Sequence, residues 1–263
     1  MAMEHSGGGD PDRTLALLWR DRDAGPAEPA RGRKPRFTID EVVDAAVKLA
    51  DANGMAATSM HCVAKALGVG TMTLYTYVPS KEELIDLMLD VVLRERAFPR
   101  PGEPRPEDWR DQVRLYADRT RAMYRRHPWV REVSMIRPSL GPGMMAGNEY
   151  LLSTMANLGL SPRDLAAAAN AVAGLIESAA GVEAGRARLE QLTGETEDTW
   201  WQRRSSFWEK YFDVTEHPTI VQVWNDGGYD DSATDQSSCA FAFGLERILD
   251  GIASIVSTVD TAD

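Results

Sequence analysis

The pattern of apolar and polar residues along this chain is helical wherever a segment is long enough to show one. Thr38 and Glu41 form a capping box, in which each side chain accepts a hydrogen bond from the other residue's backbone amide. Apolar residues then recur at helical spacing at Val42, Val43, Ala46, Val47, Leu49 and Ala50. Because no period-two alternation lies nearby, the pattern predicts an all-α fold.

Two short helices and a longer one are predicted next, and a glycine turn separates the two short ones. They are marked by a cap at Ser59, inward-facing Val63, Ala64 and Leu67, a break at Gly68, and a third helix from Thr71 to about Tyr77. Ser80 to Glu83 form a second capping box, which opens a longer helix running to about residue 96. This order predicts a helix-turn-helix on a three-helix base, and the alternative is an ordinary helical bundle with short helices.

The rest of the chain divides at a proline-rich stretch, residues 98–106. Helical patterns resume at about 107–126, 147–158, 162–190, 197–213 and 236–257. We expect residues 1–30 to be a flexible N-terminal extension, with an apolar island at 15–19 that docks on the body. Residues 31–82 are predicted to form the helix-turn-helix DNA-binding domain with a basic arm. Residues 83–263 are predicted to form a larger helical domain, and the resemblance given below implies that this domain serves ligand binding and dimerisation.

Charge is spread unevenly along the chain, so the net charge of −11 does not describe the charge of each segment. Residues 31–81 hold seven basic and four acidic residues, whereas residues 1–30 hold three basic and six acidic ones. Residues 82–263 therefore account for the whole negative excess. A local basic segment beside an acidic body fits a protein that binds nucleic acid through one module, because local charge sets the phosphate-binding surface. The alternative is that the acidic surface only keeps the protein soluble.

Several classes of function find no support in the sequence. No apolar run approaches the roughly 18 residues of a membrane span, and no secretion signal opens the chain. The two cysteines, Cys62 and Cys239, lie far apart, which favours a reducing cytoplasm and no disulfide framework. The four histidines show no metal-ligand spacing, and no catalytic motif occurs. We therefore expect a cytoplasmic protein without cofactor, metal site, membrane contact or enzymatic activity.

Residues 37–92 resemble the DNA-binding domain of the TetR family of transcription regulators. The resemblance is carried by the stretch from Met60 to Leu84, MHCVAKALGVGTMTLYTYVPSKEEL, with its VAxxLGV helix, its recognition helix ending in LY, and its following lysine. Arg126 to Trp129 and Phe241 to Arg247 resemble the tetracycline-repressor-type C-terminal domain. The chain also resembles regulators of antibiotic export that carry a basic arm. Gly70 and His61 depart from the usual residues, which leaves the operator sequence open.

The resemblance implies which residues meet DNA. Thr71 and Met72, at the start of the recognition helix, are expected at base edges, and Thr73, Tyr75, Tyr77 and Lys81 at phosphates. The basic arm is expected to enter the minor groove, as homeodomain arms do. The full predicted set is Arg31, Arg33, Lys34, Arg36, Ser59, His61, Thr71, Met72, Thr73, Tyr75, Thr76, Tyr77 and Lys81. The alternative for the tyrosines is internal packing, whereas Leu74 is expected in the core.

Two further surfaces are predicted in the body. Methionine and aromatic residues suit an adaptable ligand pocket, for which the candidates are Met123, Trp129, Met135, Met155 and Trp208. The same residues suit plain core, so both interpretations stay open. The helices at 162–190 and 236–257 are expected to pair with a second copy in a four-helix bundle. The candidate interface residues are Leu175, Leu245, Ile248, Leu249 and Ile252.

Together these features predict a homodimeric repressor that binds a palindromic operator and is released by a small hydrophobic molecule. By its resemblance, it is expected to control an efflux or antibiotic-related gene. Two alternatives remain: a constitutive or protein-regulated DNA-binding dimer without an effector, and a helical small-molecule enzyme.

Overall fold

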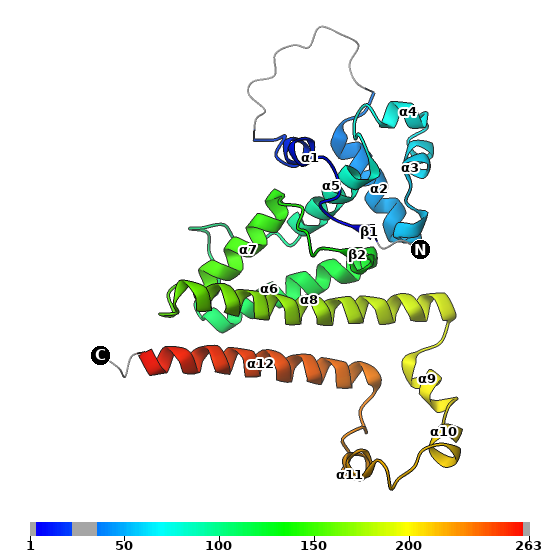
Figure 1. Cartoon of the computed structure of the whole chain (residues 1–263), viewed down its shortest axis with the longest axis vertical. Coiled ribbons are helices and arrows are strands. Elements are labelled where there is room, and N and C mark those ends of the chain that lie inside the picture. The colour runs from blue at the N-terminus through cyan, green and yellow to red at the C-terminus, as the bar shows by residue number, and fades with distance from the viewer. Residues whose placement is uncertain (1–3, 23–35, 260–263) are drawn as a thin grey trace. The chain divides into compact units, whose positions relative to one another are not determined.

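The computed structural model describes residues 4–22 and 36–259, and these form an almost entirely helical protein (Figure 1). The all-α prediction is confirmed. The elements in chain order are β1 Glu4–His5, α1 Pro11–Leu18, α2 Ile39–Asn53, η1 Met55–Ala57, α3 Met60–Ala66, α4 Thr71–Leu74, α5 Lys81–Arg94, α6 Trp109–Arg126, η2 Pro128–Glu132, β2 Val133–Ser134, α7 Pro142–Met155, α8 Pro162–Thr193, α9 Glu197–Gln202, α10 Ser206–Lys210, α11 Pro218–Asn225 and α12 Ala233–Val259.

The described residues fall into two compact units that divide at residue 169. The first holds all elements from β1 to α7 and the first turns of α8, and the second holds the rest of α8 and the helices α9 to α12. This division reflects how the residues pack and does not test the expected boundary between a DNA-binding and a ligand-binding domain after residue 82, which stays a prediction.

Helix α2 begins as the sequence predicts. The Thr38 side chain accepts from the amide of Glu41 at 3.1 Å, and the Glu41 carboxylate accepts from the amide of Thr38 at 2.7 Å. One face of α2 is buried, at Val42, Val43, Ala46, Val47 and Ala50. The burial of this apolar stripe, more than intrinsic propensity, stabilises the helix in the fold.

Helix α5 is the central element of the first unit and contacts α7, α2 and α1. Its apolar residues are buried almost throughout, and so are three carboxylates, at Glu83, Asp86 and Asp90. Each carboxylate accepts a backbone amide from another segment: Asp10 at 3.2 Å, Gly7 at 2.9 Å and Gly143 at 2.7 Å, respectively. Gly143 permits this approach, because a Cβ there would lie 2.5 Å from the Asp90 carbonyl oxygen.

The N-terminal extension differs from the flexible tail that its composition suggests. Residues 4–22 pack against the first unit: β1 pairs in parallel with β2, and α1 lies on α5. Ser6 and Leu18 are fully buried. The expected docking of the apolar island does occur, since Leu18 belongs to it. Gly7 and Asp10 belong to the Gly- and Asp-rich segment that suggested mobility, and their backbone amides donate hydrogen bonds to carboxylates of α5.

The second unit departs from the sequence pattern in two places. The helix expected over 197–213 is two short helices, α9 and α10, and α11 lies where no helix was expected. Aromatic side chains of this region contact one another, including Trp201 with Trp208 and Trp208 with Trp224. A periodic apolar pattern alone therefore overestimated the length of the helix.

One helix of the first unit also differs from its expected bounds, since α7 begins at Pro142, earlier than the expected residue 147.

Helix α8 qualifies a further expectation. Among the described residues it is long and apolar enough, by length and composition, to cross a membrane, although the sequence showed no uninterrupted apolar run of that length. One such helix is weak evidence, because helices of ordinary soluble proteins pass the same test.

Candidate nucleic-acid interface

The helix-turn-helix is built from α3 and α4. The Ser59 hydroxyl caps α3 by accepting from the amide of Cys62 at 3.2 Å. Gly68 then takes a positive φ of 66°, which lets the chain turn sharply into α4. Val63, Ala64 and Leu74 are buried. These inward residues leave the opposite faces of both short helices free for a partner.

Helix α4 ends at Leu74, three residues before the predicted end, so Tyr75 to Tyr77 lie in the following turn. Gly70 caps it without a side-chain hydrogen bond. Met72 is 78% exposed and Tyr75 is 40% exposed, and Thr73 and Thr76 are exposed as well. An exposed side chain on so short a helix contributes little to its own fold, which makes this surface the natural place for contacts with another molecule.

Other predicted DNA-binding residues gather around this surface. His61 is exposed, and its Nδ1 lies 3.4 Å from the Thr71 hydroxyl oxygen, so α3 and α4 bring these two side chains together. The Tyr77 hydroxyl accepts from the amide of Phe37 at 3.4 Å, which joins the turn after α4 to the start of α2. Arg36 is exposed with its guanidinium over the ring of Phe37. Arg31, Arg33 and Lys34 lie outside the described residues.

Lys81, the first residue of α5, has a partner that the sequence did not suggest. Its ammonium group forms an ion pair with the carboxylate of Glu4 on β1. The Ser80 hydroxyl caps the helix by accepting from Glu82 and Glu83. A phosphate at Lys81 would therefore compete with Glu4 for the same ammonium group.

A polar cluster joins the end of α2 to η2. Asp51 accepts from the Trp129 indole at 2.8 Å and lies 2.7 Å from His127 Nδ1. The other ring nitrogen of His127 lies 3.0 Å from Glu95, whose pKa is lowered: burial opposes the shift, but hydrogen bonds from His127 and Arg126 outweigh it. These contacts attach the end of α2 to the end of α5 through groups far apart in sequence.

The predicted ligand-pocket residues lie in two places. Met123, Trp129 and Met155 are buried in the first unit, Met135 is half-buried there, and Trp208 lies in the second unit. None of them lines the cavity that the first unit contains, which opens beside Leu18, Trp19, Arg94 and Pro142. Sequence reasoning missed that cavity, because its lining comes from α1, α5 and α7 together. The role of the predicted pocket residues stays a prediction.

The predicted dimer residues are partly buried within one chain. Leu245, Leu249 and Ile252 are at most 5% exposed, and Leu175 and Ile248 are half-buried. The large exposed apolar side chains of α8 and α12 are different residues: Val182, Leu189, Leu192, Phe243 and Ile255. The interface stays a prediction, and these exposed residues are better candidates for it.

The architecture defines the class of protein: a helix-turn-helix module on a larger helical body. Two family models match the chain, "Bacterial regulatory proteins, tetR family" over residues 42–88 and "Tetracyclin repressor-like, C-terminal domain" over residues 100–256. The HTH-type transcriptional repressor DrrR1 of Streptomyces coeruleorubidus is 40% identical over 97% of this chain and 90% of its own. The chain belongs to the TetR family of DNA-binding transcription regulators, which confirms the resemblance found in the sequence.

Solved structures agree with this placement. Apo ActR from Streptomyces coelicolor is 27% identical, with a TM-score of 0.66, and the match covers 87% of this chain and all of that one. ActR in complex with actinorhodin has a TM-score of 0.67 at the same identity, over 82% of this chain and 95% of that one. BioQ with its double-stranded DNA operator is 21% identical, with a TM-score of 0.55, over 83% of this chain and 99% of that one, and shares the fold.

Proposed function

We propose that this chain is a homodimeric repressor in the cytoplasm, which binds a palindromic operator and is released by a small molecule. The observation that carries the proposal is the surface of α4, whose side chains are exposed except for buried Leu74 and half-buried Thr71. Hydroxyl and thioether groups on this short helix, with the tyrosines of the turn that follows it, suit contacts with base edges and phosphates in the major groove.

The proposed roles follow from position. Thr71 and Met72 lie at the start of α4 and are assigned to base edges, with Met72 against a thymine methyl group. Tyr75, Tyr77 and Lys81 are assigned to phosphates, and the basic arm to the minor groove. Two copies are needed, because recognition helices that enter successive major grooves lie about 34–36 Å apart in a two-fold dimer.

Ligand response is supported by relatives that bind small molecules. ActR has been solved with actinorhodin and with (S)-DNPA, and it is 27% identical to this chain. Helix α5 is the connecting element, since it begins at Lys81 and ends at Arg94, beside the cavity of the first unit. A ligand that favours one arrangement of α5 lowers DNA affinity by its differential affinity for the two states. The controlled gene is proposed to serve efflux or an antibiotic-related process.

The test is fluorescence anisotropy with a labelled duplex taken from upstream of the chain's own gene. Wild-type protein is expected to bind it, and Thr71→Ala combined with Tyr75→Ala to bind at least about tenfold more weakly. Equal binding of an unrelated duplex by both proteins would show that this surface does not read an operator. Release of the duplex by small molecules then separates a ligand-responsive repressor from one that is constitutive or controlled by a protein partner.

A further inference from the structure

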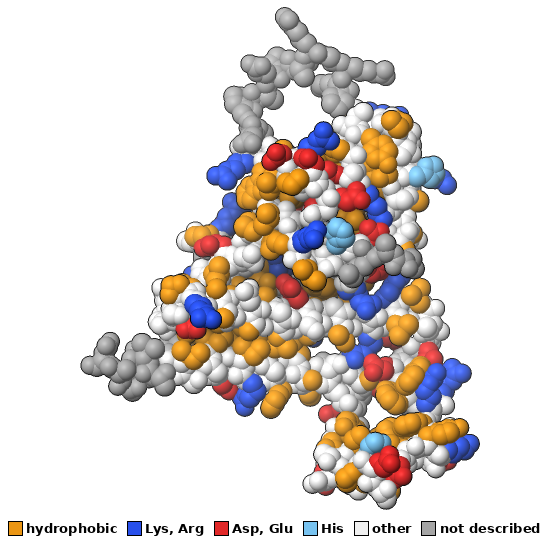
Figure 2. Space-filling model, in the orientation of Figure 1, with side chains coloured by type: hydrophobic (Ala, Val, Ile, Leu, Met, Phe, Trp, Pro, Cys, Tyr) orange, Lys and Arg blue, Asp and Glu red, His pale blue; other side chains and the backbone are white. Residues whose placement is uncertain are grey.

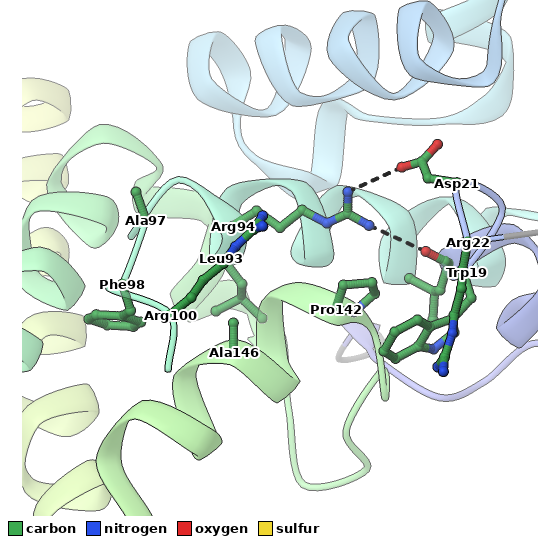
Figure 3. A pocket seen from close by; sticks show the side chains of 11 residues that line it. Trp19, Asp21, Arg22, Leu93, Arg94, Ala97, Phe98, Arg100, Pro142 and Ala146 are labelled. Atoms are coloured by element: carbon green, nitrogen blue, oxygen red, sulfur yellow. Dashed lines mark hydrogen bonds and ion pairs between the residues drawn. The ribbon is translucent and has the colours of Figure 1, made fainter. Parts of the chain in front are cut away.

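The first unit contains a cavity of about 720 Å³ where the N-terminal extension meets the end of α5 and the first turns of α7. Its volume falls within the range of small-molecule sites, roughly 300–1,000 Å³. The apolar part of its lining is Leu18, Trp19, Leu93, Ala97, Phe98, Pro142 and Ala146. Figure 3 shows Phe98 and Arg100 at one end and Trp19 and Arg22 at the other.

The polar part of the lining is strongly basic. It consists of Arg22, Arg94 and Arg100, with Asp21 as the only acid. Arg94 is already occupied: its guanidinium donates to Asp90 at 2.8 Å, to Asp21 at 3.4 Å and to the Leu18 carbonyl at 3.3 Å. Within the described ranges, Arg22 and Arg100 have no carboxylate at ion-pair distance. Two guanidinium groups are therefore available to a ligand.

A further positive charge lies next to Phe98, outside the cavity lining. Arg96 is 4% exposed, and its guanidinium lies 5.1 Å from the centre of the Phe98 ring. Its hydrogen-bond acceptors in the described part of the chain are neutral oxygens, of Leu93, Tyr116 and Gly143. A buried charge without an opposite charge is costly, and a nearby anion lowers that cost.

Phe98 forms an ordered aromatic end of the cavity. Its ring stacks on Tyr116, with ring centroids 5.0 Å apart, and on Tyr150, with centroids 4.8 Å apart. Because Phe98 is only 9% exposed, it presents little more than an edge to a ligand, and this stacked ring loses little rotamer freedom when a ligand binds. Apolar walls with guanidinium groups at both ends fit a molecule that is flat, apolar and negatively charged at its edge.

We propose that this cavity binds a planar aromatic anion, such as an aromatic carboxylate. The ring system packs on Trp19, Pro142 and Ala146, lining residues whose side chains are at least partly exposed. The anionic group pairs with Arg22 or Arg100, since guanidinium and carboxylate form paired, charge-assisted hydrogen bonds. The N-terminal extension supplies Leu18, Trp19 and Arg22 to this site. A bound ligand therefore stabilises the extension in its docked position.

Docking of the extension also places Glu4 on Lys81. A ligand that stabilises the docked extension keeps Lys81 in that ion pair and away from a DNA phosphate, which gives the ligand the effect of an inducer. This consequence rests on the proposed function, whereas binding in the cavity does not.

Calorimetric titration of the full-length protein tests the cavity, with anthraquinone-2-carboxylate and its neutral carboxamide as probes. The carboxylate is expected to bind at least about tenfold more tightly than the carboxamide. Arg22→Gln combined with Arg100→Gln should weaken the carboxylate at least about tenfold and leave the carboxamide unchanged. Arg163→Gln removes a charge outside the cavity and should change neither. Ala146→Phe places a bulky ring in the part of the cavity beside α7 and should weaken both, with circular dichroism as the check on folding.

Three results would overturn the cavity assignment. The first is that the carboxylate binds no better than the carboxamide, and the second is that neither probe binds at about 1 mM. The third is that the double arginine variant binds the carboxylate as tightly as the wild-type protein does. Operator binding by the same samples separates this outcome from the other proposal. If the protein without probe binds no operator duplex, the proposed function is contradicted, but the cavity assignment is not. If the probe binds in the cavity but does not release the operator, the cavity is a binding site for the anion but not an effector site.

Discussion

The two units of this protein expose surfaces of opposite character. In the first unit, α4 and the turn that follows it expose hydroxyl groups of Thr73 and Thr76 and the phenol ring of Tyr75. In the second unit, many large apolar side chains are exposed: Leu192 and Phe243 are each 68% exposed, and Figure 2 shows hydrophobic side chains gathered over α9 to α11. Hydroxyl and aromatic groups on a helix-turn-helix suit contacts with DNA, whereas an apolar surface of this extent suits another protein surface.

This contrast indicates which partner each unit requires. Contacts with phosphates depend on salt, because binding releases counterions from DNA. Burial of apolar surface is much less sensitive to salt, since it depends on the area removed from water. We therefore expect the first unit to bind DNA and the second unit to bind a second copy of the chain, and each expectation has its own test.

The largest effect is expected from a charge on the apolar surface of α12. Phe243→Glu should yield a folded monomer that binds operator at least about a hundredfold more weakly, because two linked half-site contacts become one. Multi-angle light scattering gives the mass, and circular dichroism gives the fold. Leu249→Glu is the matched control on the same helix: Leu249 is fully buried, so this variant should unfold rather than dissociate. A folded Phe243→Glu dimer would move the interface elsewhere.

The next effect concerns the basic arm. Replacing Arg31, Arg33, Lys34 and Arg36 by Gln should weaken operator binding by roughly tenfold to a hundredfold at moderate salt. The slope of log affinity against log salt should fall by about one for each phosphate that the arm no longer neutralises. Substitution is preferable to deletion of residues 1–36, because deletion would also remove the buried Ser6 and Leu18. Unchanged affinity and slope would show that the arm is only a tether.

A smaller and opposite pair of effects is expected at Lys81. Lys81→Ala should weaken operator binding by about tenfold and lower the salt slope by about one per subunit. Glu4→Gln frees the same ammonium group and should tighten binding a few-fold. Lys210→Ala, in the second unit, is the charge-matched control and should leave affinity unchanged. Weaker binding by Glu4→Gln would mean that the docked extension supports the DNA surface instead of competing for it.

The smallest effect separates stability from binding. Burial raises the pKa of Asp86 above its ordinary 3.8, against a hydrogen bond from the Gly7 amide. Between 3.8 and the raised value, the folded state holds more protons than the unfolded state, so stability falls as pH rises through this window. Asp86→Asn should reduce that fall, and the part that remains belongs to Asp90, whose pKa is also raised by burial. Denaturant titrations at several pH values measure it, with exposed Asp44→Asn as the control, and an unchanged profile would contradict the assignment.

The sequence predicted best where local signals decide the structure. The cap at Thr38, the buried stripe of α2 and the turn at Gly68 each depend on neighbours within a few residues, and all are present in the fold. The early end of α4 and the break between α9 and α10 were missed, since apolar spacing continues across both.

Long-range contacts explain the remaining differences. The extension docks because Gly7 and Asp10 meet carboxylates of α5 that lie more than 70 positions away. The cavity draws on three segments, and Met123, Trp129 and Met155 pack into core instead of lining it. No local pattern distinguishes a buried methionine from one that faces a ligand, which is why the sequence left both interpretations open.

The most direct test of the account is thermodynamic reciprocity between DNA and ligand. A small molecule that lowers operator affinity, with anthraquinone-2-carboxylate as the first to try, is titrated by calorimetry into free protein and into protein saturated with operator duplex. The account predicts that operator weakens ligand binding by the same factor by which ligand weakens operator binding. Equal ligand affinity in the free and the operator-bound protein would contradict it.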